Sequence, residues 1–431
     1  MCNIAQGNHS HHHHSHTHND DVHDGHTHGH THGQTHDQTH EPAHQSRHDS
    51  GRDSTSRRDF MRVLMGGALV GASAMELAFH RAAWARAAAP ANSNDLFDFV
   101  NAAPGVYFAH ARPQTMINCN AAVFVRSKDV VVVDAHSKPS AASSIIGQIR
   151  RQITDKPVRY VINTHFHWDH TQGDHGYKRA DGKMDFIASS MTKGLMEKYC
   201  VARMKESADS VPPRIERMRR RAENATSAAE KTFCEDEIRQ MQAYLADLKE
   251  NYELVLPTIT FDKSYLLSDP AFDLHLEFHG RSHTAGDTFV YCPQRRAIAT
   301  GDASHGWLPT ITDGYPRSWP GTVDEVAKLD FKYILGGHGP MQTERTVMTS
   351  QRNYIEELAE KVEAGKKAGQ DIAELQKRLT VASLKSMQSN GYQAFLEKTR
   401  AAENTHFGPM SPLQNDVNGN IADVFKNLDK A

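Results

Sequence analysis

The stretch Asn163-Thr-His-Phe-His-Trp-Asp-His170 constrains this 431-residue chain more than any other. It follows Val158-Arg-Tyr-Val-Ile162, a run of β-branched residues typical of a buried strand. Side chains of the types that bind metals then come in quick succession: His165, His167, Asp169 and His170. The two histidines at the strand end leave the chain on the same side, whereas the later pair follows a turn. One loop can therefore supply ligands to two adjacent cations.

Neutral imidazoles together with a carboxylate suit zinc, and also manganese or iron. The alternative is a histidine-rich polar turn that binds nothing. The order of these residues, directly after a predicted strand, argues against that alternative.

These residues resemble the signature of the metallo-β-lactamase superfamily, and three later segments match the rest of its pattern. The segments are Gly280-Arg-Ser-His283-Thr-Ala-Gly-Asp-Thr, Thr300-Gly-Asp302-Ala and Gly336-Gly-His338-Gly-Pro. The resemblance covers roughly Ala103 to Pro340. It implies an α/β chain that folds as a four-layer αβ/βα sandwich, with metals at one edge of two facing sheets.

The same resemblance assigns seven ligands to two zinc ions, with manganese or iron as alternatives. It gives His165, His167 and His283 to the first ion, Asp169, His170 and His338 to the second, and Asp302 to both. Asp169 would also be catalytic, by orienting the attacking water or passing a proton. Asp134 would brace the ligand loop from the end of a preceding strand, and His175 has no metal role.

The chemistry implied is hydrolysis. A water between two divalent cations ionises near neutral pH and can attack an acyl carbon, while one cation stabilises the developing oxyanion. No G-x-S-x-G serine elbow is present. The resemblance thus implies a zinc-dependent hydrolase of a small-molecule ester, lactone, thioester or β-lactam. Asp302 stands where true class B β-lactamases usually have cysteine or serine, so β-lactams rank below the other substrates.

The first 55 residues suggest another class of function. Residues 1–55 alternate histidine with small polar residues and hold more than half of the chain's 29 histidines. Such a segment cannot bury apolar area, so we expect it to be disordered. It could bind zinc, copper or nickel loosely, or have no selected role. It raises the alternative that the protein is a non-catalytic zinc-binding or zinc-trafficking protein; a β-lactamase proper is a further alternative.

Residues 56–87 resemble a twin-arginine export signal. Arg57 and Arg58 precede an aspartate and a phenylalanine, an apolar small-residue run follows, and Ala85-Arg-Ala87 offers a cleavage site. An ordinary basic stretch before a helix is the alternative. The signal implies a periplasmic enzyme, exported folded by the twin-arginine translocase. Disulfides would then be unnecessary, so we expect four free cysteines: Cys119, Cys200, Cys234 and Cys292.

Residues 88–345 are predicted to form the metallo-β-lactamase domain, and residues 346–431 a C-terminal helical extension. A charged helical insertion is predicted at about residues 191–253, with a break at Pro212-Pro213. It would be a lid or wall over the metal cleft, a homodimer contact, or a solvated hairpin. The net charge of −3 does not indicate a nucleic-acid partner, and no stable membrane span is expected in the mature chain.

Some local elements are predicted within this layout. A strand is expected at Leu254–Phe261, helices at Ser350–Gly365 and Asp371–Leu384, and irregular chain from Asn404 onward. By the resemblance, a loop with His305 and Trp307 lies beside the metals, where these residues would contact substrate or form a structural turn.

Overall fold

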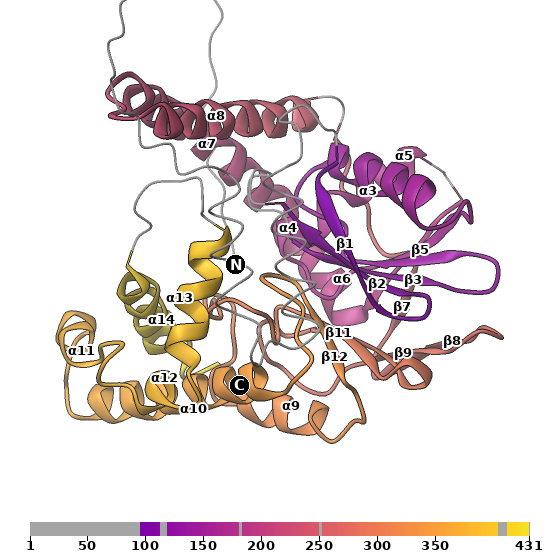
Figure 1. Cartoon of the computed structure of the whole chain (residues 1–431). Helices are drawn as coiled ribbons and strands as arrows, with labels where there is room; N and C mark the ends of the chain where they lie inside the picture. The colour runs from indigo at the N-terminus through magenta and orange to yellow at the C-terminus, as the bar shows by residue number, and fades with distance from the viewer. Residues whose placement is uncertain (1–94, 113–118, 181–182, 250–251, 404–411, 431) are drawn as a thin grey trace, which may run out of the picture. The chain divides into compact units, whose positions relative to one another are not determined.

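The computed structural model describes residues 95–112, 119–180, 183–249, 252–403 and 412–430. The predicted histidine-rich tail (1–55) and export signal (56–87) lie outside these residues. The described part combines two β-sheets with helices (Figure 1), which confirms the predicted α/β fold class.

The first sheet has seven strands in the order β1-β2-β3-β4-β5-β6-β7. They are β1 (Phe97–Ala103), β2 (Val106–Ala111), β3 (Ala121–Val125), β4 (Val130–Val133), β5 (Val158–Ile162), β6 (Asp185–Ser189) and β7 (Ile259–Phe261). Strands β1 to β4 pair antiparallel, and β4 to β7 pair parallel.

The second sheet has five strands in the order β12-β11-β10-β9-β8. They are β8 (Ser264–Leu267), β9 (Leu274–Glu277), β10 (Phe289–Cys292), β11 (Ala297–Gly301) and β12 (Tyr333–Gly336), with the 3-10 turn Pro293–Arg295 between β10 and β11. Only β11 and β12 pair parallel within this sheet.

Alternation along single strands shows how the layers form. In β4, Val131 and Val133 pack in the core that the two sheets share, whereas Val130 and Val132 pack on the opposite face. Successive side chains of a strand point to opposite faces of its sheet, so a fully apolar strand is buried on both sides. Each sheet is therefore an inner layer and requires a helical layer outside it.

Helices supply both outer layers. Helices α3 (Pro139–Gln152) and α5 (Asp174–Ala180) cover the first sheet, where Ile145, Ile149 and Tyr177 pack on its outer valines. Helices α9 (Trp319–Val326) and α10 (Thr346–Lys367) cover the second sheet through a core that includes Trp319 and Tyr354. The predicted four-layer sandwich is thus observed.

The predicted helical insertion is present as a hairpin (Figure 1). It was expected between the two halves of the sandwich, but it connects β6 and β7, which are neighbours in the first sheet. It consists of α6 (Ser190–Leu195), a π-helical turn (Met196–Cys200), α7 (Val201–Glu223) and α8 (Ala228–Lys249). The predicted break at Pro212-Pro213 is wrong, because α7 runs through both prolines. Both are exposed, so the carbonyls they leave unpaired can bond water, while Val211 and Ile215 pack against α8.

Two further expectations need correction. The strand predicted at Leu254–Phe261 is formed only by β7, because Pro257 cannot donate to the ladder and the leucines before it pack beside Phe166 instead. The helix predicted at Asp371–Leu384 ends early, as α11 (Ile372–Arg378). Thr380 and Ser383 then exchange side-chain to backbone hydrogen bonds, which compete with the helix.

The expectation of irregular chain from Asn404 is also wrong. After α12 (Lys385–Gln388) and α13 (Tyr392–Glu403), residues Leu413–Asn427 form α14. Its buried residues Leu413, Val417, Ile421 and Val424 recur at helical spacing and join the core over the second sheet. No helix among the described residues is long and apolar enough to cross a membrane.

Candidate metal centre

Parallel strand pairs in the two sheets bring the predicted ligands together. β4 and β5 end side by side, so Asp134 lies next to the loop that begins at Asn163. β11 and β12 also end side by side, so Asp302 lies next to His338. His283 enters from the loop between β9 and β10. All seven predicted ligands meet there, in overlapping groups whose ligand atoms lie within 4.8 Å of one another.

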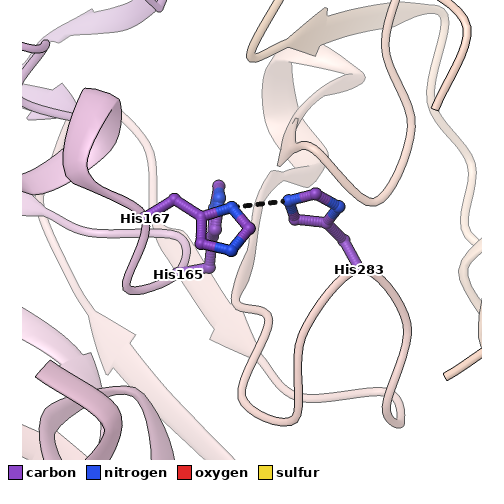
Figure 2. A group of neighbouring side chains, drawn as sticks. All are labelled: His165, His167 and His283. Atoms are coloured by element: carbon purple, nitrogen blue, oxygen red, sulfur yellow. Dashed lines mark hydrogen bonds between the residues drawn. The ribbon is translucent and has the colours of Figure 1, made fainter. Parts of the chain in front are cut away.

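The first group consists of His165, His167 and His283 (Figure 2). His167 directly precedes the short helix α4 (Trp168–Thr171), and its Nδ1 lies 2.9 Å from Nε2 of His283. The rings of His165 and His283 stand almost perpendicular, 4.8 Å apart. The three imidazoles thus converge from two loops that are more than a hundred residues apart in sequence.

Hydrogen bonds to the outer ring nitrogens fix where the protons lie. His283 donates from Nδ1 to the carbonyl oxygen of Thr310 (3.0 Å), so its Nε2 carries a lone pair. The single hydroxyl hydrogen of Thr164 goes to Asp134, so that hydroxyl accepts from Nδ1 of His165 (3.0 Å). Nε2 of His165 is then also a lone pair, and this buried atom has no hydrogen-bond partner among the described residues.

His167 follows the same rule. Its Nε2 lies 2.8 Å from Oδ2 of Asp313, and a carboxylate can only accept, so His167 donates from Nε2. Its Nδ1 faces the Nε2 lone pair of His283 at 2.9 Å. Two ring nitrogens at that distance share either a proton or a metal cation. The donor set of the first group thus fits a metal that prefers neutral imidazole.

The second group consists of Asp169, His170 and His338. His338 Nε2 lies 3.1 Å from Oδ2 of Asp169, and His170 Nε2 lies 3.5 Å from the same oxygen. Nε2 of His170 is buried without a hydrogen-bond partner among the described residues. This group mixes nitrogen and oxygen donors, as zinc, manganese and iron sites do.

Asp302 lies between the two groups. Its carboxylate oxygens are 3.3 Å from Nε2 of His338, 3.4 Å from Nε2 of His170 and 3.7 Å from Nε2 of His283. It is the one described carboxylate that lies beside both the second group and His283. This position between the two groups is the one predicted for Asp302.

Asp134 braces the ligand loop as predicted. It accepts hydrogen bonds from the backbone N–H of Thr164 (2.8 Å), from the hydroxyl of Thr164 and from Nδ1 of His170 (2.9 Å). The last bond leaves Nε2 of His170 facing the cluster. Histidine ligands of metals are commonly oriented by such a carboxylate.

The residue before His338 must be glycine, because the clustered side chains leave no room for a Cβ at Gly337. A Cβ built on Gly337 would come within 2.2 Å of Oδ1 of Asp302 and 2.8 Å of the His170 ring. Any side chain here would fill the space between the ligands. The backbone of this loop is therefore part of the wall around the cluster.

Burial and neighbouring charges give the histidines of the cluster different pKa values. Burial, with neighbouring imidazoles, holds the pKa of His165 well below its usual value and lowers the pKa of His283 to about 3. Burial alone would also lower the pKa of His338, but the carboxylates of Asp302 and Asp169 outweigh it and raise that pKa to about 9. At neutral pH His165 and His283 are therefore neutral, while His338 holds a proton between two carboxylates.

The loop after β11 lies beside the second group, as the resemblance implied. The Trp307 ring stacks on the His338 ring, with centroids 4.5 Å apart and planes at 17°. His305 is buried, its ring centroid lies 5.6 Å from that of His338, and its Nδ1 accepts from the Trp307 backbone N–H. His175 lies away from the cluster, with its Nδ1 accepting from the Glu253 backbone.

Several residues at the site were missed in the sequence. Thr164, Thr310 and Asp313 each fix the orientation of a histidine. Thr164 lies inside the motif and could have been identified as a brace. Thr310 contributes only its backbone carbonyl, and Asp313 is far from His167 in sequence and meets it only in the folded chain. No local sequence pattern therefore identifies either residue.

A further group, Cys119, Asp134 and His170, also has metal-type side chains close together. We assign it no metal, because the oxygens of Asp134 already accept from Thr164 and His170. Burial raises the pKa of the Cys119 thiol to about 12, which disfavours the thiolate that would bind a metal. The four described cysteines are all buried and free, as expected.

Comparison with known proteins agrees with this geometry. The sequence pattern described as "Metallo-beta-lactamase superfamily" matches residues 115–338, more than half of the chain. The matched span includes all seven clustered residues.

Solved structures with similar folds have low sequence identity to this chain. The stereoselective inverting sec-alkylsulfatase Pisa1 from Pseudomonas sp. is 16% identical, with a TM-score of 0.50, covering 74% of this chain and 52% of that one. A metallo-beta-lactamase from Pontibacter korlensis is 15% identical over 59% of this chain and 95% of that one (TM-score 0.41). A metallo-beta-lactamase from Pseudomonas aeruginosa, in its mono-zinc form, is 15% identical over 62% and 98% (TM-score 0.44).

Proposed function

Because the chain belongs to the metallo-beta-lactamase superfamily, we propose that it is a metal-dependent hydrolase with two divalent cations in its histidine–aspartate cluster. One observation carries the proposal. Nδ1 of His167 and Nε2 of His283 lie 2.9 Å apart, while the outer nitrogen of each ring is committed to an oxygen acceptor. A metal cation can replace the proton that such a nitrogen pair otherwise shares.

The number of ligands supports two ions rather than one. A tetrahedral zinc site uses three or four protein ligands, whereas seven ligand side chains converge here. The first group has three nitrogens, which suit zinc, and the second adds carboxylate oxygens, which zinc, manganese and iron all accept. We propose zinc in both positions.

Two such ions would supply a water that ionises near neutral pH and an electrophile for the oxygen of the scissile bond. Asp169 is suited to orient that water. Its pKa is lowered to about 2, because His170 and His338 outweigh the effect of burial, so the carboxylate stays ionised and can accept a hydrogen bond. Trp307, flat against His338, offers an apolar face beside the reacting centre.

The proposed substrate is a small molecule with an ester, lactone or thioester bond, and a β-lactam ranks lower. The argument for this order is the carboxylate of Asp302 between the two groups. A sulfate ester belongs in the same test, because the sec-alkylsulfatase shares the fold. Shared fold alone does not fix the substrate.

We propose the periplasm as the location and the twin-arginine translocase as a transient partner. The support is the pair Arg57-Arg58 before an apolar run, with Ala85-Arg-Ala87 after it. The N-terminal histidines would then be removed with the signal, so the proposed activity does not require them.

The test is a hydrolase panel on the zinc-loaded protein, with lactone, ester, thioester, β-lactam and sulfate-ester substrates. We expect turnover that a chelator abolishes and zinc restores. His283→Ala should lower turnover by about 10²-fold or more, by analogy with loss of one oxyanion donor. His279→Ala is the matched control, because His279 pairs with Glu277 outside the cluster, and it should retain the parental rate.

The result also separates the enzyme from a zinc-binding protein. Tight zinc binding by the cluster with no turnover of any panel member would favour a non-catalytic zinc-binding role. Equal turnover by His283→Ala and the parent would show that the activity does not come from this site.

A further inference from the structure

A chain of three residues connects the helical hairpin to the first metal group. Arg203, in the first turn of α7, contacts Asp313 through both guanidinium nitrogens, at 2.6 and 2.9 Å. Oδ2 of Asp313 in turn lies 2.8 Å from Nε2 of His167. The hairpin, the loop before α9 and the ligand loop thus meet at one carboxylate.

Geometry makes this carboxylate a strong acceptor. The fork of an arginine matches the two oxygens of a carboxylate, which gives the pair a fixed orientation. Both oxygens of Asp313 face donors, since Arg203 donates to each of them and His167 lies against Oδ2. Asp313 therefore accepts, so a proton of His167 lies on Nε2 and its Nδ1 faces the cluster.

Arg203 is itself held in place. Its guanidinium lies over the Phe166 ring, 4.9 Å from the centroid, and near the Tyr199 ring at 5.1 Å. Phe166 lies between His165 and His167 in sequence, so the arginine also packs on the ligand loop itself. Cation–π contacts of this kind favour arginine over an aliphatic side chain.

The hairpin contacts the ligand loop at a second place. Trp168, directly after His167, packs edge-on against Tyr244 of α8, with ring centroids 5.7 Å apart. The hydroxyl of Tyr244 donates a hydrogen bond to the side-chain oxygen of Gln172, the residue just after α4. The hairpin is therefore a wall of the metal site, docked on both sides of His167, and it is more than a solvated insertion.

We propose that Asp313 and Arg203 are positioning residues for the first metal group, which fix the tautomer and orientation of His167 from the helical hairpin. The proposal rests on the metal-binding role proposed above for His167. It assigns a function to α7 that does not depend on the substrate. A carboxylate behind a metal-binding histidine commonly raises metal affinity by about 10- to 100-fold.

The test compares variants of the full-length chain. Asp313→Asn keeps the shape and removes the charge, and an amide can donate to Nε2 and so allow the wrong tautomer. Arg203→Lys keeps the charge and removes the fork. Asp129→Asn is the matched control, because Asp129 is paired with both ends of the Arg126 fork at 2.8 Å, with similar exposure, and contacts no cluster residue.

The first measurement is the tautomer of His167 in metal-free protein, from long-range nitrogen–proton NMR with labelled histidine. His167→Gln assigns the signal. We expect Nε2-protonated His167 in the parent and in Asp129→Asn, and a shift toward Nδ1 protonation in Asp313→Asn. An unchanged tautomer in a folded Asp313→Asn protein overturns the proposal. Because no metal is present, this result is independent of the proposed hydrolase activity.

The second measurement is zinc affinity by chelator competition. All variants carry the same N-terminal histidines, so differences between them report on the cluster. We expect Asp313→Asn to bind zinc about 10- to 100-fold more weakly, Arg203→Lys to show a smaller loss, and Asp129→Asn to match the parent. Should Asp313→Asn fail to fold, Arg203→Lys decides: parental tautomer and parental affinity in that variant overturn the proposal. A parent without zinc in the cluster would refute the proposed function, while the tautomer still decides the positioning role.

Discussion

Replacing Asp134 by asparagine tests how much the hydrogen bond from Nδ1 of His170 to this carboxylate contributes to metal affinity. Asp134 has φ of +69°, in the left-handed region, which asparagine tolerates better than alanine does. The substitution therefore keeps the volume and the backbone while it removes the charge and one acceptor. The native carboxylate accepts from the N–H and hydroxyl of Thr164 and from Nδ1 of His170.

The structure leaves the new amide two orientations, and each has a cost. If its NH₂ faces His170, the ring must accept at Nδ1, and the proton moves to Nε2, where the metal should bind. If its NH₂ faces the backbone N–H of Thr164, a buried donor loses its acceptor, which costs about 1–3 kcal/mol. Since about 1.4 kcal/mol is tenfold in an equilibrium constant, zinc affinity should fall by roughly 10- to 100-fold, or stability by the same free energy.

The assay pairs chelator competition for zinc with urea unfolding of the metal-free chain. Asp269→Asn is the control, because Asp269 also accepts three hydrogen bonds, but from two backbone N–H groups and a hydroxyl that belong to Ser127 and Ala271. Zinc affinity within twofold of the parent, together with an unfolding free energy within about 0.5 kcal/mol, would refute the reasoning about His170.

Three other outcomes are expected. His338 should release a proton when zinc binds at pH 8, because its pKa is raised to about 9 while ordinary histidines are already neutral there. His170 should add to this release, because its pKa is also raised well above the usual value. Calorimetry in buffers of different ionisation enthalpy should detect this proton, and affinity should rise with pH up to about 9; binding without release would contradict the assignment. Ile421→Ala should destabilise the chain by about 2–5 kcal/mol in urea unfolding, because the side chain is fully buried in α14, while zinc content stays unchanged. Changing Arg57 and Arg58 to lysine should leave the precursor in the cytoplasm on cell fractionation, and normal delivery would exclude the twin-arginine route.

Much of the fold could be predicted because its information is local. The valines of β4 and β5 and the motif that follows them predict a strand that ends in a ligand loop. Helix α14 was missed although Leu413, Val417 and Ile421 recur at helical spacing. The break predicted at Pro212 failed because a proline's effect on a helix depends on whether water can reach the freed carbonyls, and exposure is a tertiary property.

The candidate site likewise contains residues that the sequence predicts and residues that it does not. All seven predicted ligands meet in the structure because each lies at a strand end or in a loop with its own local pattern. Arg203 and Asp313 could not be predicted, because they are 110 residues apart and meet only when the hairpin docks. Residues such as these orient a ligand from a distant segment, so a single sequence does not identify them.

Anomalous X-ray diffraction at the zinc edge, from crystals of zinc-loaded protein, tests directly whether the cluster holds two metal ions. We expect two peaks in the cluster. One should be bonded by His165, His167 and His283, the other by Asp169, His170 and His338, with Asp302 between them. Zinc bound elsewhere on the chain, with no peak among these side chains, would contradict it.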